Sequence, residues 1–413
     1  MTTTDEPIGI ADYLSLIDPA NRPDPYPLLA RMRAAGPFRL GSAPVVVFPG
    51  YADCATVLRH PDARVDRRLS AFELSQFPDP RTGDDERGPA FLFRDPPDHT
   101  RLRRLVAKAF TPRVVQTMEP RITALVDGIL DRVSGTEFDV VAELAYPLPV
   151  TVICELLGVP LEGEARLGRW SALMSRKLDP TSRSTAEFAA DPAAVDQASD
   201  ELYEYFEELT VRRRADPGPD LLSELIAAEE AGDKLSHDEL ISTCGLLLIA
   251  GHETTVNLIG NAVLALLRNP EQLAALRADP ALAAAVVEET LRYDPPVQLA
   301  PRIAAADLRI GDFPVRRGEV MIMLLAAAQR DPRLNPDPDR FDPRRDIRHL
   351  AFGAGAHFCL GAPLARLEAR VALTRFALRV REPRLLLDPP PYRDHVTLRG
   401  PAALPVGFTE IAP

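Results

Sequence analysis

The residues with the clearest chemical meaning surround one cysteine, Cys359. It follows a glycine-containing stretch, 352–358, and precedes a segment of helical composition that starts at about Leu360. Pro363 fits the first turn of such a helix, where its missing N–H costs nothing. The sulfur would then lie at a helix N-terminus, where free N–H groups and the helix dipole favour an anion. This setting suits a thiolate that binds a metal or acts as a nucleophile.

The size of the dipole effect helps to choose between these uses of the cysteine. A helix dipole stabilises a nearby anion by about 0.3–1 kcal/mol, and by up to about 2 kcal/mol in a partly buried site. Since one pKa unit corresponds to about 1.4 kcal/mol, the dipole lowers a thiol pKa by about one unit. A coordinated metal would deprotonate the thiol outright, and the glycines leave room for a flat, large group. The alternative is a structural cysteine in a glycine-rich turn, because buried free cysteines are common.

A second candidate site lies in the apolar stretch 246–255. Gly251 in a helix interior costs about 1 kcal/mol relative to alanine. The consecutive threonines that begin at Thr254 restrict χ1 and can bond back to helix carbonyls. An acid, Glu253, and a hydroxyl therefore stand at a weakened turn, which suits local opening around a small ligand; the alternative is a buried helix with a packing glycine. A zinc-protease HExxH motif is excluded because Val256 replaces the second histidine.

Charged side chains form further patterns. His99 and Arg103 are spaced i,i+4 and would share one helix face. Glu289 and Arg292 are spaced i,i+3, a pair worth under about 1 kcal/mol if exposed. The stretch 99–113 has five basic residues and no acidic one, namely Arg101, Arg103, Arg104, Lys108 and Arg113. This local charge predicts either a solvated basic face or a docking surface for an acidic partner.

The elements that must position these residues are mostly helical. A helix over 237–267 would be about 46 Å long and could cross a domain. The other expected helices are 26–35, 99–110, 120–132, 194–214, 270–277, 280–293 and 360–379. Strands are expected at 45–48, 320–324, 308–310 with 313–315, and 396–398 with 405–408. We therefore predict a mainly α fold with small β-sheets (α+β), in which residues 1–413 form a single domain because no segment reads as a boundary.

Composition limits the possible functions. The 413 residues have a net charge of −12, from 48 basic and 60 acidic residues, which argues against nucleic-acid binding. Four cysteines without a CxxC pair indicate neither a disulfide framework nor a zinc site. Residues 1–16 contain acids and no apolar core, and apolar runs such as 321–328 are far shorter than the roughly 18 residues needed to span a bilayer. We expect a cytoplasmic protein with no membrane anchor.

Taken together, the motifs resemble those of the cytochrome P-450 family, from about Asp95 to the end of the chain. Residues 352–361 resemble its haem-binding loop, 250–255 its AGxET-T pattern, and 289–292 its ExxR pair. The resemblance implies the bacterial-type P-450 fold, with haem b between the long central helix and the helix after the cysteine loop. It also implies that Cys359 is the axial thiolate ligand of the haem iron.

The resemblance assigns roles to further residues. Haem propionates need basic or donor groups, and the matching positions are His99, Arg103, Arg302 and His357. Other matching haem-contact positions are Phe352, Gly353, Gly361, Ala250 and Gly251. Thr254 and Glu253 match the catalytic pair that delivers protons during dioxygen activation, which is general acid chemistry worth about 10²–10⁴ in rate. His252 lies at a variable position and receives no role.

The ExxR pair belongs to a structural network by the same resemblance. In the family this pair is buried and joined by an arginine from a later loop. Residues 338–341 resemble that loop, with Arg340 as the third member. Removal of one partner from such a buried network should cost roughly 3–5 kcal/mol. We expect these residues to serve folding and haem retention.

The function implied is that of a haem-thiolate monooxygenase. Such an enzyme inserts one atom of dioxygen into an organic substrate, here by hydroxylation or epoxidation of an apolar secondary metabolite such as a polyketide or macrolide. Electrons would come from NAD(P)H through a ferredoxin (or flavodoxin) and its reductase, because the chain has no flavin or iron–sulfur segment. With Arg103 turned inward to haem, four basic residues would remain for the donor.

Other functions stay open. A haem-thiolate enzyme could instead catalyse desaturation, C–C coupling or a peroxide-dependent oxidation, although Thr254 and Glu253 argue against peroxide dependence. A haem-less, non-catalytic partner protein would not need Cys359, Thr254 and the propionate set together. The substrate contacts implied by the resemblance lie in 69–93, 167–195, 249–255, 297–300 and 402–404.

Overall fold

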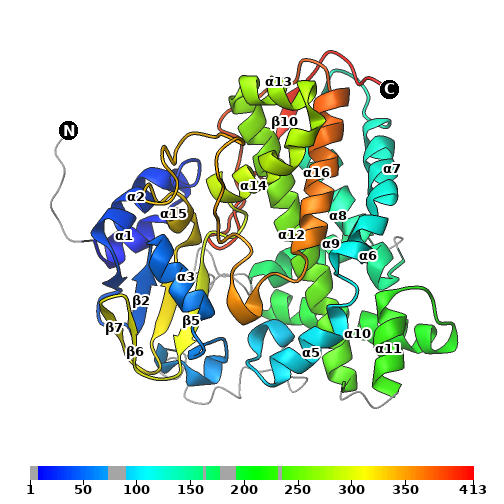
Figure 1. Ribbon diagram of the computed structural model, residues 1–413. Helices are drawn as coiled ribbons and strands as arrows, with labels where there is room; N and C mark the ends of the chain where they lie inside the picture. The colour runs from blue at the N-terminus through cyan, green and yellow to red at the C-terminus, as the bar shows by residue number, and fades with distance from the viewer. Residues whose placement is uncertain (1–7, 73–89, 161–163, 177–191, 231–234) are drawn as a thin grey trace.

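The computed structural model describes residues 8–72, 90–160, 164–176, 192–230 and 235–413. A larger helical part and a smaller part that carries the main sheet lie side by side (Figure 1). The helices are α1 Ile10–Ser15, α2 Tyr26–Ala35, α3 Tyr51–Arg59, α5 Asp98–Val106, α6 Pro112–Thr117, α7 Glu119–Leu130, α8 Pro147–Leu157, α9 Glu164–Arg176, α10 Pro192–Ala215, α11 Leu221–Glu230, α12 His237–Arg268, α13 Pro270–Ala278, α14 Ala283–Tyr293, α15 Leu325–Gln329 and α16 Ala362–Arg379. The strands are β1 Phe38–Arg39, β2 Val45–Phe48, β3 Ala63–Arg64, β4 Glu137–Asp139, β5 Ala300–Ala304, β6 Leu308–Ile310, β7 Phe313–Val315, β8 Val320–Met323, β9 Arg384–Leu385 and β10 Pro405–Gly407. The mainly α class with small sheets is confirmed.

The main sheet has the strand order β1-β2-β8-β5-β3. Its central pair, β2 and β8, is parallel, and the other neighbours are antiparallel. All four residues of β2 are buried because both faces of the sheet are covered. Val45 and Val47 pack with side chains of α2 and α15, whereas Val46 and Phe48 pack with those of α3. This alternation follows from the two-residue period of a strand.

The sheet core also supports the cysteine loop. Leu350 and Ala354, which precede Cys359, belong to the same buried cluster as Val46 and Leu58. The loop therefore rests on the face of the sheet that α3 covers, so the sheet fixes one side of the candidate site.

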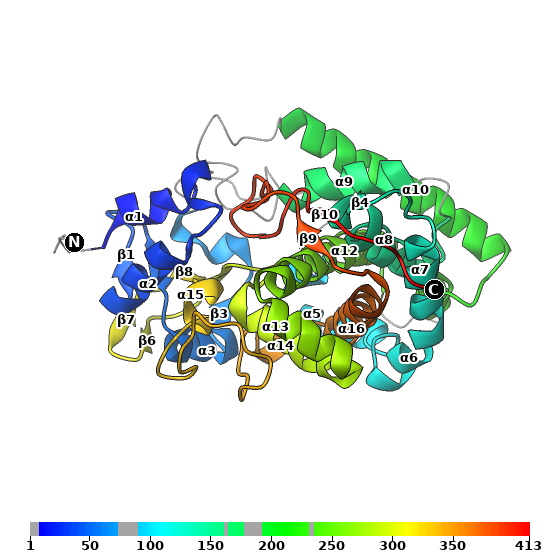
Figure 2. The same ribbon diagram turned by 90° about the horizontal axis from the view of Figure 1, so that it is seen from above.

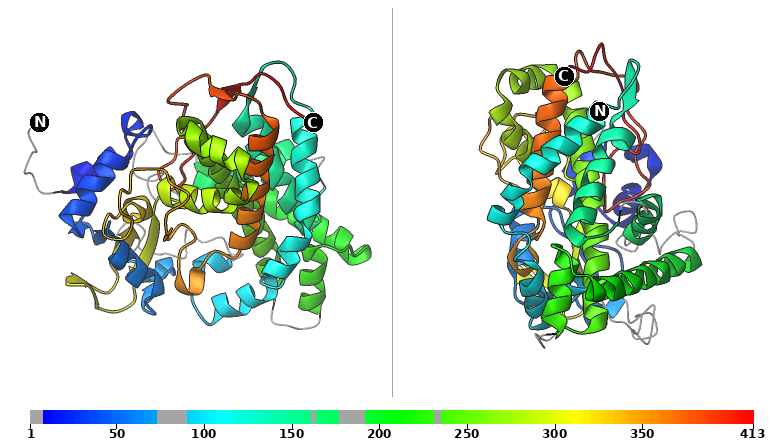
Figure 3. Two further views of the ribbon diagram at one scale, coloured as in Figure 1. Left: turned by 45° about the horizontal axis from the view of Figure 1, so that its top comes forward. Right: turned by 90° about the vertical axis from the view of Figure 1, so that its right-hand side faces the viewer.

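The longest helix, α12, runs through the middle of the helical part (Figure 2). It begins at a capping box in which Ser236 Oγ accepts a hydrogen bond from the Glu239 N–H at 3.2 Å, and the Glu239 carboxylate accepts one from the Ser236 N–H at 3.0 Å. Its 32 residues span about 48 Å at 1.5 Å per residue. It packs against α8, α14 and α16, whose buried side chains belong to the same helical core. The right-hand view of Figure 3 shows α10 lying crosswise to α12 and α16.

Several predicted elements are confirmed. The helix 26–35, the strand 45–48 and the hairpin of β6 and β7 have the expected bounds. The pairing of 396–398 with 405–408 was wrong, since β10 pairs with β4 and β9, and Leu398 forms only an isolated bridge to Val297. Strand partners depend on tertiary contacts that local sequence does not specify.

Two helices that frame the site, α3 and α8, were not predicted. Helix α8 is buried on most of its surface, including Leu148, Val152 and Ile153. A helix buried all round lacks the polar face whose period would reveal it. Among the described helices, none is both long and apolar enough to cross a membrane. The single-domain organisation stays a prediction.

Candidate active site

The cysteine loop has a shape that depends on glycine. Gly353 and Gly355 both have φ +69°, in the left-handed region that favours glycine. A Cβ on Gly355 would lie 2.5 Å from the Leu58 carbonyl oxygen, so the loop packs directly against the end of α3. The Cys359 N–H donates to the Phe352 carbonyl at 2.8 Å and closes the loop. The cysteine is thereby held in a fixed position before α16.

The half-buried sulfur of Cys359 lies at the N-terminus of α16, which begins two residues later than predicted. Burial raises the pKa of this thiol, while hydrogen bonds from the backbone N–H groups of Gly361 and Ala362 and the charges of Arg103 and Arg366 lower it. Donors and cations therefore surround an atom that a metal would hold as an anion.

The four predicted propionate partners come together beside the loop. The rings of His99 and His357 lie 4.1 Å apart, and within the described ranges all four ring nitrogens are buried without a hydrogen-bond partner. Arg103 donates to the Phe358 carbonyl, and Arg302 donates to the Pro301 carbonyl at 2.7 Å.

The electrostatics of this cluster indicate a missing anionic partner. Burial together with neighbouring cations lowers the pKa of His357 to about 3, and burial lowers that of Arg302 to about 10. Buried polar groups are nearly always hydrogen-bonded, so unpaired imidazoles beside two guanidinium groups call for a ligand carboxylate. The cluster therefore fits the propionates of haem.

The middle of α12 presents a small open patch. Ala250 is exposed and Thr254 is half-buried, although the neighbouring helix residues are mostly buried. The Thr254 hydroxyl donates to the Ala250 carbonyl at 3.0 Å, which is the expected back-bonding. The helix is continuous here, so the local opening expected from the sequence is not seen.

The two predicted haem-contact glycines Gly251 and Gly361 lie in different surroundings. A Cβ on Gly251 would lie 3.3 Å from Ile153 of α8, so this residue has a packing role at the α12–α8 contact. A Cβ on Gly361 would meet no described atom within 4 Å, so this position borders open space beside the sulfur. Phe352 lies under Arg366, whose guanidinium carbon is 4.5 Å from the ring centre.

The buried acid Glu253 has a partner that sequence reasoning missed. Its Oε2 accepts a hydrogen bond from Arg393 Nη1 at 2.8 Å, and its Oε1 lies 3.7 Å from His252 Nε2. Arg393 belongs to the irregular segment between β9 and β10, and no local pattern in the sequence connects it with α12.

Comparison with known proteins decides the family. Residues 187–381 match the family model for Cytochrome P-450. The chain is 42% identical to the vitamin D(3) 25-hydroxylase of Pseudonocardia autotrophica, over 93% of each chain. It is 42% identical to the 6-deoxyerythronolide B hydroxylase of Saccharopolyspora erythraea, over 76% of each. The crystal structure of ligand-free CYP164A2 from Mycobacterium smegmatis superposes with a TM-score of 0.91 at 54% identity, covering 96% of this chain and 100% of that one.

The chain belongs to the cytochrome P-450 family. It is a bacterial-type P-450 monooxygenase, and its cofactor is haem b. Bacterial P-450 enzymes receive electrons from redox partners such as ferredoxins and bind apolar substrates.

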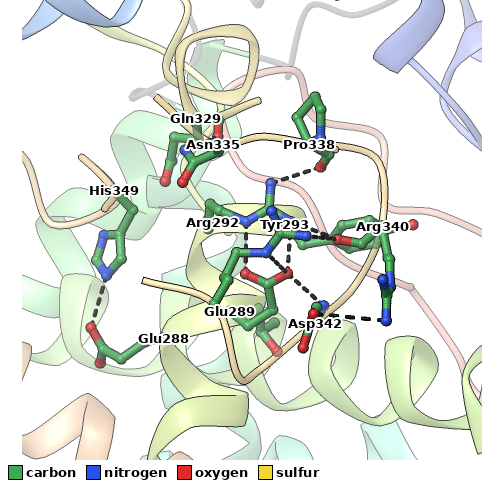
Figure 4. A network of polar contacts seen from close by, with 12 residues as sticks. Glu288, Glu289, Arg292, Tyr293, Gln329, Asn335, Pro338, Arg340, Asp342 and His349 are labelled. Carbon is green, nitrogen blue, oxygen red and sulfur yellow. Dashed lines mark hydrogen bonds and ion pairs between the residues drawn. The ribbon is translucent and has the colours of Figure 1, made fainter. Parts of the chain in front are cut away.

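The ExxR network of this P-450 differs from the prediction in one member. Glu289 and Arg292 form two hydrogen bonds of 2.7 Å, and neither side chain is exposed. Arg340 was the expected third side chain, but it is 63% exposed and lies 3.8 Å from Asp342 (Figure 4). Arg345 takes that place, with Nε 3.2 Å from Glu289 Oε1.

The backbone explains this exchange. Arg340 contributes its carbonyl oxygen, which accepts hydrogen bonds from Arg292 at 3.1 Å and from Arg345 at 2.7 Å. The Asp342 N–H also donates to Glu289 Oε1 at 2.7 Å. The turn formed by 337–342 thus sends the Arg340 side chain outward, and the chain returns to the pair at Arg345. The sequence shows several arginines in this loop but not the turn that selects one.

The basic stretch 99–113 of this P-450 has fewer basic side chains available to a partner than its composition indicated. Arg101 forms ion pairs with Glu239 at 2.6 Å and with Asp98 at 3.5 Å. Arg104, Lys108 and Arg113 are exposed. Three basic residues, rather than the expected four, therefore remain for a partner.

Proposed function

We propose that this P-450 inserts one oxygen atom from dioxygen into a bulky, mainly apolar natural product, such as a polyketide or macrolide, by hydroxylation or epoxidation. The observation that carries the proposal is the pair formed by the buried acid Glu253 and the hydroxyl of Thr254, on the helix that faces the cysteine loop. Proton delivery by such a pair is what dioxygen activation requires.

In this proposal Cys359 holds the haem iron, and His99, Arg103, Arg302 and His357 hold the propionates. When bound, haem supplies the iron centre at which dioxygen is activated. The Thr254 hydroxyl donates its hydrogen to the Ala250 carbonyl. The lone pairs of Oγ1 therefore stay available to accept a hydrogen bond from a water molecule on the open side of α12. Glu253, one residue earlier, supplies the proton through its carboxyl group.

We further propose that electrons from NAD(P)H arrive through a ferredoxin or flavodoxin and its reductase. Arg104 on α5, Lys108 in the turn after it and Arg113 at the start of α6 are exposed. Phe358, next to the ligand cysteine, is 42% exposed. Exposed positive charges suit an acidic partner, since charge complementarity speeds and orients docking.

The substrate class is supported by both relatives named above, which hydroxylate vitamin D(3) and 6-deoxyerythronolide B. Of the predicted substrate contacts, 73–89 and 177–191 lie outside the described residues. Leu404 is fully buried in the helical core, whereas Ala402 is exposed and Ala403 is half-buried.

Two measurements test the proposal. The reduced protein with carbon monoxide should show the red-shifted band of thiolate ligation, and Cys359→Ala should abolish it; a band of histidine ligation would remove Cys359 as the ligand. Candidate compounds can be screened for the spin-state shift that follows displacement of a water ligand. With ferredoxin, reductase and NAD(P)H, a hit should yield a product that carries one atom of labelled dioxygen. Desaturated or coupled products without the label would overturn the insertion reaction.

A further inference from the structure

The central helix carries a buried histidine, His252, that the proposed reaction does not use. Its side chain is 3% exposed. Nδ1 lies 3.3 Å from the Leu248 carbonyl oxygen and 3.2 Å from Ser171 Oγ on α9. Because a carbonyl oxygen can only accept a hydrogen bond, the Leu248 contact places the ring hydrogen on Nδ1. In a neutral ring, Nε2 is then an acceptor.

The neighbour of Nε2 is the acid of the proposed proton relay. Nε2 lies 3.7 Å from Glu253 Oε1, is buried, and has no hydrogen-bond partner in the part of the chain that the structure describes. With a neutral ring and an ionised acid, two sets of lone pairs would face each other away from water, which is unfavourable. One proton on either atom turns the contact into an attractive one, so this geometry is favourable when the two atoms hold one proton between them.

The other oxygen of Glu253 is held by a cation. Arg393 Nη1 donates a hydrogen bond to Oε2 at 2.8 Å. Burial lowers the pKa of His252; the Glu253 carboxylate and the Leu248 carbonyl oppose this shift, and Arg393 adds to it. Among the residues that the structure describes, Tyr146 also faces the imidazole, with its ring edge-on and the two ring centres 5.8 Å apart. Arg393 and the imidazole thus compete for one carboxylate.

We propose that His252 and Glu253 jointly hold one exchangeable proton beside Thr254, and that Arg393 sets how readily the pair takes it up. The inference rests on the proposed role of Glu253 in proton delivery. When the pair is protonated, the proton lies on His252 Nε2 or on Glu253 Oε1. Transfer of the proton between these two atoms needs no other reactant. His252 and Arg393 are positioning residues, since both act through Glu253.

The direct test reads the protonation state of the ring rather than turnover. Nitrogen-15 NMR of the seven histidines in the diamagnetic ferrous carbon-monoxide holoenzyme gives the state of each ring nitrogen, and H252Q assigns the His252 signals. Nε2 should titrate, and R393Q should raise the pH midpoint by about one unit, a tenfold change in proton affinity. R393K should restore the wild-type midpoint. A ring that remains a neutral Nδ1–H tautomer at every pH in both proteins would overturn the proposal.

A matched control separates this effect from a general loss of ion pairing. Arg268, at the C-terminal end of α12, forms an ion pair with Asp388, which lies in the same segment between β9 and β10 as Arg393. R268Q should leave the His252 midpoint unchanged. If R268Q moves the midpoint as much as R393Q does, the specific role of Arg393 is refuted.

A second readout uses the enzyme with ferredoxin, reductase and NAD(P)H, without added substrate. In H252Q the pH profile of peroxide released per NAD(P)H oxidised should shift to lower pH, because the imidazole that shares the proton in the proposed pair is absent. An unchanged profile would assign His252 a packing role. The NMR result does not depend on turnover, so failure of the monooxygenase reaction and failure of this inference are distinguishable.

Discussion

Arg345, not Arg340, forms the third arm of the buried network, with its Nε 3.2 Å from Oε1 of Glu289. The two arginines are five residues apart in one loop, but their side chains are 12% and 63% exposed, respectively. This contrast allows a matched pair of variants, in which the same residue type is replaced at a buried and at an exposed position of one loop.

Arg345→Ala should lower the free energy of unfolding by roughly 3–5 kcal/mol, because it leaves the Glu289 carboxylate short of one buried partner. Arg340→Ala should cost under about 1 kcal/mol, since it removes an exposed ion pair and keeps the carbonyl that Arg292 uses. Urea denaturation of the two holoenzymes, followed by haem absorbance, measures both values. Equal losses of unfolding free energy in the two variants would show that burial does not decide how much each arginine contributes to stability.

The propionate cluster predicts how firmly haem is retained. Arg302→Ala should weaken haem binding by about 10–100-fold, since a hydrogen bond to a charged group contributes about 1.5–3 kcal/mol. Arg309 on the neighbouring hairpin is exposed and provides the control, with little change expected for Arg309→Ala. Transfer of haem to an excess of apomyoglobin measures the rate of haem loss from each variant. Equal rates in both variants would show that Arg302 does not contribute to haem retention.

Thr254→Ala should separate substrate binding from oxygen chemistry. The variant keeps the helix, because the lost bond to Ala250 is a back-bond within one turn. A compound found by the spin-state screen should bind with unchanged affinity, while most electrons go to peroxide and product yield falls by about tenfold or more. Peroxide release and product formation are measured together, and unchanged coupling would remove Thr254 from the relay.

Glu368 of α16 predicts a pH dependence of stability. This carboxyl is buried, its Oε2 has no partner among the residues described, and burial raises its pKa to about 8. The folded pKa exceeds the unfolded value, so the folded protein binds the proton more tightly, and stability declines as pH rises from the unfolded pKa towards 8. Glu368→Gln removes this loss and should be more stable than the wild type by on the order of 3 kcal/mol at the alkaline end.

The check on Glu368 is the free energy of unfolding measured at several pH values. The difference between variant and wild type should be small at pH 5 and grow towards pH 8. A difference that is constant with pH would show that Glu368 does not titrate in this range.

The sequence by itself determined the family and the order of the motifs, because these depend on local patterns. Glycines at positive φ, a cysteine before a helix and a Thr254–Glu253 pair inside an apolar helix have consequences within a few residues of each other. The helix 26–35 and the strand 45–48 were predictable for the same reason, since hydrophobic period and capping act over short distances.

Only the tertiary structure decided which distant side chains meet. Arg393 reaches Glu253 across 140 residues, and Arg345 rather than Arg340 reaches Glu289 across a turn. The strand partner of β10, the packing role of Gly251 and the pairing of Arg101 with Glu239 also depend on chain segments that are far apart in sequence. Such contacts are selected by the packing of whole helices and sheets, and the residue types alone permit several alternatives of similar local energy.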